Sequence, residues 1–338
     1  MNSAVLRVCC LTVGDYLAPS TRFRLLNLAP LLRARDIVVD VCLPGGSRFS
    51  ELLAVSGGVM RAHVVLVQKR LIPTWLVHVL LRTKVPLVYD FDDAVWVTPS
   101  GDPVPVRERS RLELLVSGAS AVVAGNLHLS EWAGQLQQEV TVIPTTLDTG
   151  VWSPKRRRAH QDLKLGWVGT RGNLTHLELI RPALARVLDA HPNVRLVVVS
   201  DTLPACFGND DRIEFRRWEL ANEVSTLADV DVGLMPLTNN AWTRGKCAFK
   251  ALQFMALAIP VIVSPVGMNS DVISHGLNGL FAVTEEDWIT SLESLIGDGD
   301  LRQRLGEAGR STVVENYDIV RAADALSSVL RKVAQGAH

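Results

Sequence analysis

The sequence of 338 residues predicts an α/β protein with two Rossmann-like domains that face a cleft. Short apolar runs rich in β-branched residues alternate with helical stretches, which is typical of mostly parallel sheets covered by helices. The alternation stops at a polar, charged stretch near the middle of the chain and then restarts. The length also exceeds what one ordinary open α/β core needs. Clefts between domains are favoured sites for small molecules.

The first domain is expected over residues 1–153. Its predicted strands are short β-type runs at Leu6–Val13, Ile37–Leu43, His63–Val67, Leu87–Phe91, Ala121–Ala124 and Val140–Ile143. Its predicted helices lie between several of these runs, at Thr21–Arg35, Thr74–Arg82, Val106–Ser117 and His128–Gln138.

Residues 154–162 are expected to form a linker, and residues 163–316 a second domain. The predicted strands of this domain are Leu165–Gly169, Val194–Ser200, Ile213–Arg216, Val230–Met235, Val261–Ser264 and Leu280–Val283. Its predicted helices are Leu174–Ala190, Ala221–Leu227, Lys246–Ile259, Glu286–Leu295 and Leu301–Asn316. The remaining residues, 317–338, contain an amphipathic helix that we expect to pack back toward the first domain.

Composition excludes some classes of partner and site. The formal net charge is zero, which argues against nucleic acid as the main partner. The five cysteines show no spacing typical of a metal site, so we expect no metal and reduced thiols in a cytoplasmic protein. No secretory leader and no membrane-spanning run are visible. The sequence leaves the oligomeric state open.

Residues 69–84 allow two interpretations. Cations flank an apolar stretch that contains Trp75, a composition found in helices at membrane surfaces. The alternative is a crossover helix packed on the sheet, because a strand follows directly. A peripheral membrane contact is therefore one expectation for this segment.

The stretch from Arg244 to Gly279 is the most informative part of the chain. Arg244, Lys246 and Lys250 lie at the start of the predicted helix Lys246–Ile259, where the helix dipole is positive. Cations are unfavourable there, so the pattern predicts a bound phosphate. The buried strand that follows leads into a loop that contains Val266, Gly267, Met268 and Asn269, and ligands bind beyond such strand ends.

Other loops offer further groups for a phosphate or a sugar. Gly169, Thr170 and Arg171 follow the first strand of the second domain, where glycine allows a close approach and arginine a bidentate contact. Asn173, next in this loop, has helix capping as its alternative role. Gly14, after the first strand of the chain, is a similar candidate for contact with a ligand.

Acidic residues follow the strand Leu87–Phe91. Asp92 and Asp93, after Asp90 within that strand, are expected at the edge where ligands bind, where they could hold hydroxyls or accept a proton. The Asp90–Asp92 spacing also suits a divalent metal, but we discount a metal because no histidine accompanies the pair. Helix capping and salt bridges are the structural alternative.

The stretch GKCAFKALQFMALAIPVIVSPVGMNSDVISHGLNG resembles the C-terminal signature of GT-B-fold glycosyltransferases of family 4. The similarity extends to Gly166–Thr170, Leu234–Pro236 and the block FDDAVW. It implies a retaining transferase that takes a UDP- or GDP-sugar as donor, needs no metal and acts on an acceptor that the sequence does not identify. It further implies that the pyrophosphate lies over the start of the helix after Arg244 and the base near Arg217 and Trp218.

The sequence departs from the family at two helix positions. The family usually has two glutamates eight positions apart, and Gly245 and Gln253 stand in their places. Gln253 can still bond ribose hydroxyls, though without charge assistance. A later family glutamate appears as Asp271. Arg244, Lys246 and Lys250 would stabilise the leaving diphosphate, and Asp92 or Asp93 would orient the acceptor or the sugar.

Two other functions remain open. A nucleotide-sugar epimerase can share this two-domain fold, but only Asp92, Asp93 and His176 could serve as its acid and base groups. A non-catalytic subunit that binds sugar nucleotides is suggested by the departures at Gly245 and Gln253.

Overall fold

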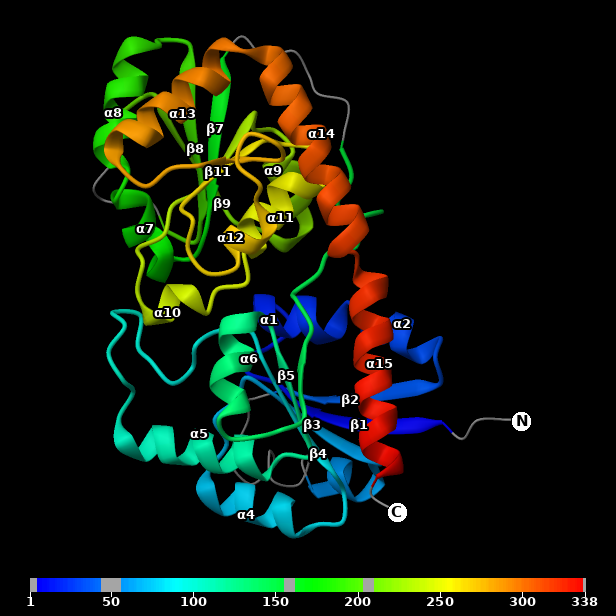
Figure 1. The fold of residues 1–338 in the computed structure, drawn as a ribbon. Coiled ribbons are helices and arrows are strands. Elements are labelled where there is room, and N and C mark those ends of the chain that lie inside the picture. Colours follow the sequence, from blue (N-terminus) through cyan, green and yellow to red (C-terminus); the bar gives the residue numbers. More distant parts are fainter. Residues whose placement is uncertain (1–4, 44–55, 155–161, 203–209, 337–338) are drawn as a thin grey trace. The chain divides into compact units, whose positions relative to one another are not determined.

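The structure is a computed structural model that describes residues 5–43, 56–154, 162–202 and 210–336 (Figure 1). The chain divides into two compact units. Unit 1 consists of residues 1–146, 240–247 and 319–338, and unit 2 of residues 147–239 and 248–318. Most of the predicted linker lies outside the described residues. Cys206 also lies outside them.

Unit 1 contains a six-stranded parallel sheet in the order β2-β1-β3-β4-β5-β6. The strands are β1 (Leu6–Leu11), β2 (Ile37–Cys42), β3 (Val64–Gln68), β4 (Leu87–Phe91), β5 (Ala121–Ala124) and β6 (Val140–Val142). All residues of β3, β4 and β5 are buried. Helices on both faces explain why these central strands are apolar runs without polar alternation.

Helices of unit 1 cover this sheet. They are α1 (Pro19–Thr21), the π-helical turn η1 (Arg22–Leu26), α2 (Ala29–Arg33), α4 (Thr74–Arg82), α5 (Val106–Gly118), α6 (Leu127–Gly134), α10 (Ala241–Arg244) and α15 (Ile319–Gln335), besides a helical segment at 56–61. The predicted helix Thr21–Arg35 is therefore interrupted. Pro30 lies in the first turn of α2 and, lacking an amide hydrogen, cannot continue the hydrogen bonding of the preceding turn.

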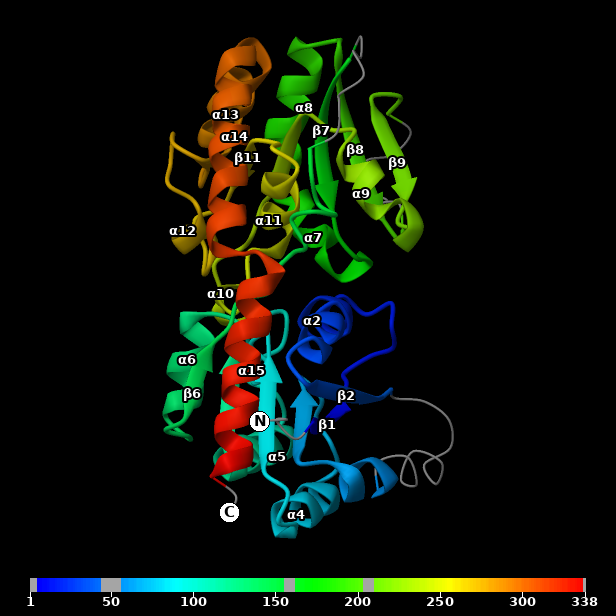
Figure 2. The same ribbon diagram turned by 90° about the vertical axis from the view of Figure 1, so that its right-hand side faces the viewer.

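The last helix, α15, packs in unit 1 beside α2 and β3 (Figure 2). Its alanine, leucine and valine side chains join the core formed by β1, β3 and α2, among them Ala323, Leu326 and Leu330. The amphipathic pattern of residues 319–333 thus reflects burial of one helix face.

Unit 2 contains a second six-stranded parallel sheet, in the order β12-β11-β10-β7-β8-β9. The strands are β7 (Leu163–Val168), β8 (Val194–Ser200), β9 (Ile213–Arg217), β10 (Val232–Met235), β11 (Val261–Val263) and β12 (Leu280–Phe281). The predicted class of two α/β domains with parallel sheets is confirmed.

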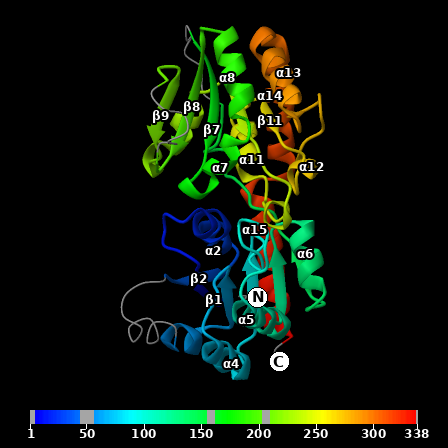
Figure 3. The same cartoon turned by 90° about the vertical axis from the view of Figure 1, so that its left-hand side faces the viewer.

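Helices also cover the sheet of unit 2. They are η2 (Arg171–Asn173), α7 (Leu174–Glu178), α8 (Arg181–Ala190), η4 (Leu220–Asn222), α9 (Glu223–Leu227), α11 (Phe249–Ala256), α12 (Asn269–Val272), α13 (Glu285–Gly297) and α14 (Gly299–Asn316). α8 and α13 pack side by side, as Figure 3 shows, and α11 packs on β10, β11 and α14. Pro182, in the first turn of α8, divides the predicted helix Leu174–Ala190.

The predicted helix Lys246–Ile259 is wrong at its start. Asn240 and Thr243 form a capping box that begins α10, which ends at Arg244. Ala248 then has a left-handed backbone (φ 52°), and α11 begins only at Phe249. A non-glycine residue in this conformation interrupts a helix. Arg244 and Lys246 therefore precede the helix instead of lying in its first turn.

Candidate functional site

The predicted site residues lie at the carboxyl edges of the two sheets, and we describe each edge within its own unit. Five of them belong to unit 1, namely Gly14, Asp92, Asp93, Arg244 and Lys246. Those in unit 2 are Gly169, Thr170, Arg171, Arg217, Trp218, Lys250, Gln253, Val266, Gly267, Met268, Asn269 and Asp271.

A lysine that the sequence analysis did not select organises the acidic edge of unit 1. Lys69 directly follows β3, and its Nζ lies 3.1 Å from Oδ1 of Asp92 and pairs with Oδ2 of Asp93. Ser20 donates a hydrogen bond to Oδ2 of Asp92 at 2.7 Å. Lys69 has a left-handed backbone (φ 54°), a strained conformation that non-glycine residues adopt rarely and that is enriched at functional sites.

This network keeps Asp92 ionised. Burial by itself would raise the pKa of Asp92, but the charges of Lys69 and Arg24 and the hydrogen bond from Ser20 outweigh burial, so the pKa lies below its usual value. The pKa of Lys69 is raised because the two carboxylates outweigh the effect of burial. Asp93 uses Oδ2 for Lys69, whereas its Oδ1 has no hydrogen-bond partner in the part of the chain that the structure describes.

Asp90 has a separate, structural role. Nε of Arg24 donates to Oδ2 of Asp90 at 2.9 Å, and Nη2 pairs with Oδ1, while Nη1 donates to the carbonyl oxygen of Ile143 at 2.9 Å. Both side chains are almost completely buried. Arg24 therefore contacts both carboxylate oxygens of Asp90. Among the described residues, no group of three or more histidine, cysteine, aspartate or glutamate side chains could hold a metal ion.

Lys246 lies near the acidic edge of unit 1, and none of the described carboxylates forms an ion pair with it. Its Nζ lies 3.6 Å from the centroid of the Trp242 ring, a cation–π contact. Burial lowers the pKa of Lys246, although the charges of Asp93 and Asp92 raise it.

Gly245, in the place of a family glutamate, lies against Ala94. A Cβ atom at position 245 would be 2.7 Å from the Ala94 amide nitrogen. Glycine fits that contact, and a larger side chain requires a shift of backbone.

Gly14 follows β1 and is packed locally. A Cβ atom there would lie 2.5 Å from that of Ala18. Thr12 donates from Oγ1 to the Gly14 carbonyl oxygen at 2.9 Å, and Thr21 does so at 3.2 Å. These contacts fix the turn between β1 and α1.

In unit 2, the glycine loop after β7 meets the side chain of Lys250. A Cβ atom at Gly169 would lie 2.4 Å from the Trp167 ring and 2.9 Å from Nζ of Lys250. Lys250 also stacks over the Trp167 ring, with Nζ 4.9 Å from its centroid. The structure therefore brings Gly169 and Lys250 together in unit 2.

The rest of this loop is exposed. Thr170 precedes the turn η2, and the Arg171 amide donates to Oδ1 of Asp201 at 2.7 Å. Asn173 makes no side-chain cap to α7; its Nδ2 donates instead to Oγ1 of Thr170 at 2.9 Å. The guanidinium of Arg171 extends from an exposed turn and is available to an anion in solution.

Gln253 on α11 contacts a glutamate that the sequence analysis also missed. Nε2 of Gln253 lies 3.4 Å from Oε1 of Glu223, the first residue of α9. Nε1 of Trp218, just beyond β9, donates to the same oxygen at 3.2 Å. Arg217 ends β9 and is exposed. Gln253 and Glu223 are buried, so three elements converge on one polar cluster in unit 2.

The loop after β11 turns through Gly267, which has a left-handed backbone (φ 55°). Val266 and Met268 are buried beside it, and Asp271 is exposed on α12. Asn269 is 1% exposed; its Nδ2 donates to the Ser264 carbonyl oxygen at 2.9 Å, but no group in the described segments donates to its Oδ1. An unpaired buried acceptor is unfavourable, and a hydroxyl of a ligand can satisfy it.

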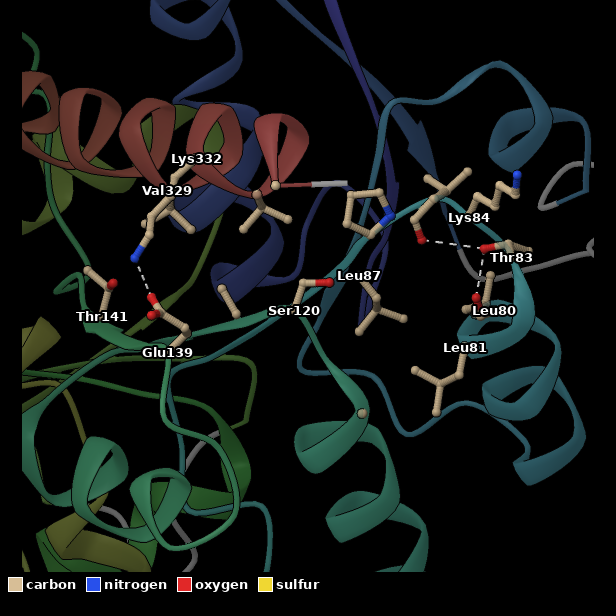
Figure 4. A pocket seen from close by; sticks show the side chains of 16 residues that line it. Leu80, Leu81, Thr83, Lys84, Leu87, Ser120, Glu139, Thr141, Val329 and Lys332 are labelled. Carbon is tan, nitrogen blue, oxygen red and sulfur yellow. Dashed lines mark hydrogen bonds and ion pairs between the residues drawn. The ribbon is translucent and has the colours of Figure 1, made fainter. Parts of the chain in front are cut away.

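A cavity of about 730 Å³ lies in unit 1 at the opposite, amino-terminal edge of the sheet (Figure 4). Leu80, Leu81 and Val329 line it, and Lys332 pairs with Glu139 at its side. None of the predicted site residues lines this cavity, so it is separate from the carboxyl edge.

The missed residues carried only weak signals. Lys69 follows a predicted strand end, as ligand-binding residues do. The sequence analysis considered it only as one of the cations that flank the possible membrane segment, residues 69–84. Arg24 stands with Arg22 at the start of a predicted helix, which indicates an anion only weakly, and Glu223 carried no pattern of its own. Their partners, Asp90 and Gln253, are distant in sequence.

Residues 162–298, almost all in unit 2, match the family model described as Glycosyl transferases group 1. This part of unit 2 is therefore similar to group 1 glycosyl transferases. The solved structure of Anabaena Alr3699/HepE in complex with UDP and glucose is similar, with a TM-score of 0.72, 15% identity and coverage of 97% of this chain and 100% of that one. Sucrose-phosphate synthase from Thermosynechococcus elongatus gives a TM-score of 0.76 at 13% identity, covering 98% and 100%. These likenesses show the GT-B fold.

Two curated relatives each match a little over half of the chain. Spore coat protein SA of Bacillus subtilis is 23% identical over 214 residues, which cover 54% of each chain. D-inositol 3-phosphate glycosyltransferase of Corynebacterium jeikeium is 23% identical over 228 residues, which cover 59% of this chain and 53% of the relative. The chain thus spans about half the length of the curated relatives it matches.

Proposed function

We propose that the protein is a retaining glycosyltransferase that moves a sugar from a nucleoside diphosphate sugar to a hydroxyl-bearing acceptor. The observation that carries the proposal is the match of residues 162–298 to group 1 glycosyl transferases. We assign the donor site to Gly169, Lys250, Gln253 and Asn269 of unit 2. Ligands of open α/β sheets bind at the carboxyl ends of the strands.

In this mechanism the cations act on the leaving group. Negative charge grows on the diphosphate as the sugar–phosphate bond breaks, and Arg244, Lys246, Lys250 and Arg171 stabilise it electrostatically. The backbone of Gly267–Asn269 contacts the sugar and phosphate. The acceptor hydroxyl passes its proton to the leaving phosphate, so no protein nucleophile takes part.

The acceptor is assigned to the carboxyl edge of unit 1. Asp93 offers its unpartnered Oδ1 to an acceptor hydroxyl, while Lys69 holds the other oxygen. A polyhydroxylated acceptor, such as a glycan, a lipid-linked glycan or a small natural product, fits such a carboxylate. We propose a UDP- or GDP-sugar as the donor; Alr3699/HepE has been crystallised with UDP-glucose, which supports the first.

A screen of nucleotides tests the donor site. UDP, GDP and their sugars are added to the protein, and the shift of thermal unfolding is measured; a ligand at 100 times its Kd stabilises by about 2.7 kcal/mol. We expect Lys246→Ala to abolish the shift caused by the diphosphate. An unchanged shift in this variant would remove Lys246 from the phosphate site.

Product analysis separates the alternatives. Incubation with a sugar nucleotide and no acceptor should leave the sugar unchanged, whereas an epimerised sugar would show an epimerase. The second alternative, a non-catalytic binding subunit, is motivated by Gly245 and Gln253. Donor binding without transfer to any acceptor in a broad screen would support it.

A membrane contact through α4 is a further part of the proposal. Trp75 and Val79 of α4 are 54% and 49% exposed, and Arg82 and Lys84 at its end are exposed cations, whereas Val77 and Leu80 are buried. Among the described residues, no helix combines the length and the apolar content of a membrane-spanning segment. Cosedimentation with phosphatidylglycerol vesicles tests the contact, and Trp75→Ser should weaken it.

A further inference from the structure

Two cysteines of unit 1 lie side by side on neighbouring strands. Cys9 is in β1, and Cys42 ends β2, the outermost strand of the sheet. The register pairs Leu11 with Cys42 and Cys9 with Asp40, so the side chains of Cys9 and Cys42 project from one face of the sheet. Their Sγ atoms form a hydrogen bond at 3.8 Å. A disulfide bond requires the two sulfur atoms to approach from this contact to about 2.05 Å.

The two thiols differ in access and in acidity. Cys9 is completely buried, whereas Cys42 is partly exposed, so an oxidant in solution meets Cys42 first. The hydrogen bond from Cys9 lowers the pKa of Cys42 to about 7, against burial and the charge of Asp40, and Arg70 and Arg61 lower it further. The same hydrogen bond, together with burial, raises the pKa of Cys9. At neutral pH Cys42 is therefore the nucleophile of the pair, and Cys9 keeps its proton.

A glycine leaves room for the two sulfur atoms. A Cβ atom at Gly58, in the helical segment at 56–61, would lie 2.7 Å from Sγ of Cys9 and 3.5 Å from Sγ of Cys42. At Gly57, the preceding residue, a Cβ atom would have no described neighbour within 4 Å. The backbone at Gly58 thus covers both sulfurs closely, and a side chain there would displace them.

We propose that Cys9 and Cys42 form a reversible oxidation site, in which hydrogen peroxide converts the two thiols into an intramolecular disulfide. The site is independent of the proposed glycosyl transfer. In a reducing compartment such a disulfide is transient and reports the level of oxidant.

The reaction takes two steps. The Cys42 thiolate attacks one oxygen of hydrogen peroxide, an S–O bond forms, the O–O bond breaks, and the released hydroxide takes up a proton to give water. The sulfur of Cys9 then attacks the sulfur of Cys42, so that an S–S bond forms and the S–O bond breaks. The departing hydroxide takes the Cys9 proton and leaves as a second water. Two thiols are oxidised and one peroxide is reduced.

The first experiment uses the wild-type chain. The reduced protein is treated with hydrogen peroxide, and peptides prepared without reducing agent are mapped by mass spectrometry. We expect a single cross-link, between Cys9 and Cys42, and a loss of two of the five thiols titrated after denaturation. Dithiothreitol should restore both thiols.

Single variants separate the roles of the two sulfurs. In Cys9→Ala the sulfenic acid on Cys42 has no resolving thiol, so dimedone should label Cys42 several-fold more than in the wild type. In Cys42→Ser peroxide should leave the buried Cys9 unmodified. Cys10→Ala is the matched control, because Cys10 is equally buried in β1 but packs in the core on the opposite face. It should keep the cross-link.

The neighbouring glycines give a test that leaves both thiols in place. Gly58→Ala should slow the formation of the disulfide several-fold, because the added methyl group meets Sγ of Cys9. Gly57→Ala should form it at the wild-type rate. Equal rates in the two variants would contradict the close contact at Gly58 that the site requires.

Three results would overturn the proposal. The first is a wild-type chain that keeps all its thiols under peroxide. The second is a disulfide that joins Cys42 to a different cysteine, such as Cys206. The third is equal dimedone labelling of Cys42 in the wild type and in Cys9→Ala, since Cys9 would then not resolve the sulfenic acid.

Discussion

Lys69 Nζ lies 3.1 Å from Oδ1 of Asp92 and joins the ends of two neighbouring strands, β3 and β4, through a buried ion pair. The same ammonium also pairs with Asp93. Two carboxylates at a sheet edge repel each other, so the lysine between them makes their close approach favourable.

Replacement of this lysine should destabilise unit 1. In Lys69→Met two largely buried carboxylates lose their cation, and we expect the free energy of unfolding to fall by on the order of 3 kcal/mol. Urea unfolding at pH 7 measures the loss. Lys84→Met, which removes an exposed lysine beyond α4, should change the value by less than about 0.5 kcal/mol.

The loss should depend on pH. The pKa of Asp92 is lowered in the folded protein, so its stabilisation is present above the ordinary aspartate pKa of about 4 and disappears as the pH falls through the lower, folded value. In Lys69→Met burial instead favours protonated Asp92. The difference between wild type and variant should therefore shrink between pH 5 and pH 3; a constant difference would contradict the ion-pair explanation.

The buried pair of Arg24 and Asp90 predicts strong coupling. Arg24→Leu or Asp90→Leu leaves one buried charge without its partner and should cost about 3–5 kcal/mol, whereas the double variant buries no charge and should cost less than the sum. A double-mutant cycle by urea unfolding gives the coupling energy. Additive effects would mean that the two charges do not stabilise each other.

Gly169 and Gly172 form a matched pair in the loop after β7. A methyl group at Gly169 meets the Trp167 ring and Lys250, whereas one at Gly172 has no neighbour within 4 Å. Gly169→Ala should lower the free energy of unfolding by about 1–3 kcal/mol and displace Lys250, which weakens diphosphate binding. Thermal unfolding with and without UDP or GDP measures both effects. Gly172→Ala should change neither; equal effects would contradict the close contact at Gly169.

Cys42 should be the reactive thiol of unit 1. A hydrogen bond from Cys9, whose Sγ lies 3.8 Å away, lowers the pKa of Cys42 to about 7, whereas burial raises the pKa of Cys247 well above its usual value. The rate of alkylation of Cys42 by iodoacetamide should rise with a midpoint near pH 7, and Cys247 should remain unmodified. Mass spectrometry of each cysteine follows the reaction.

Replacement of Cys9, the hydrogen-bond donor to Cys42, is the control for this prediction. In Cys9→Ala the Cys42 thiolate loses its hydrogen bond, so the midpoint should move up toward the ordinary cysteine value of about 8.5. A midpoint that stays near pH 7 would assign the lowered pKa to another cause, such as the positive charges of Arg70 and Arg61.

The two parallel sheets and the approximate position of each strand could be predicted from the sequence, because buried strands need short, apolar, β-branched runs and these stand out locally. In the structure Gly169 and Lys250 meet, since the ends of parallel strands share one edge of a sheet. The two prolines that divide predicted helices, Pro30 and Pro182, were visible in the sequence, and the interruptions follow from known proline geometry.

Tertiary structure alone decided the partners of the charged residues. Lys69 meets Asp92, Arg24 meets Asp90 and Glu223 meets Gln253 because strand order and helix packing bring distant segments together, and no local pattern encodes these contacts. The start of α11 was likewise decided by the left-handed backbone of Ala248, a conformation that alanine does not favour by itself. The surrounding contacts impose it, and with it the separation of Arg244 and Lys246 from the helix.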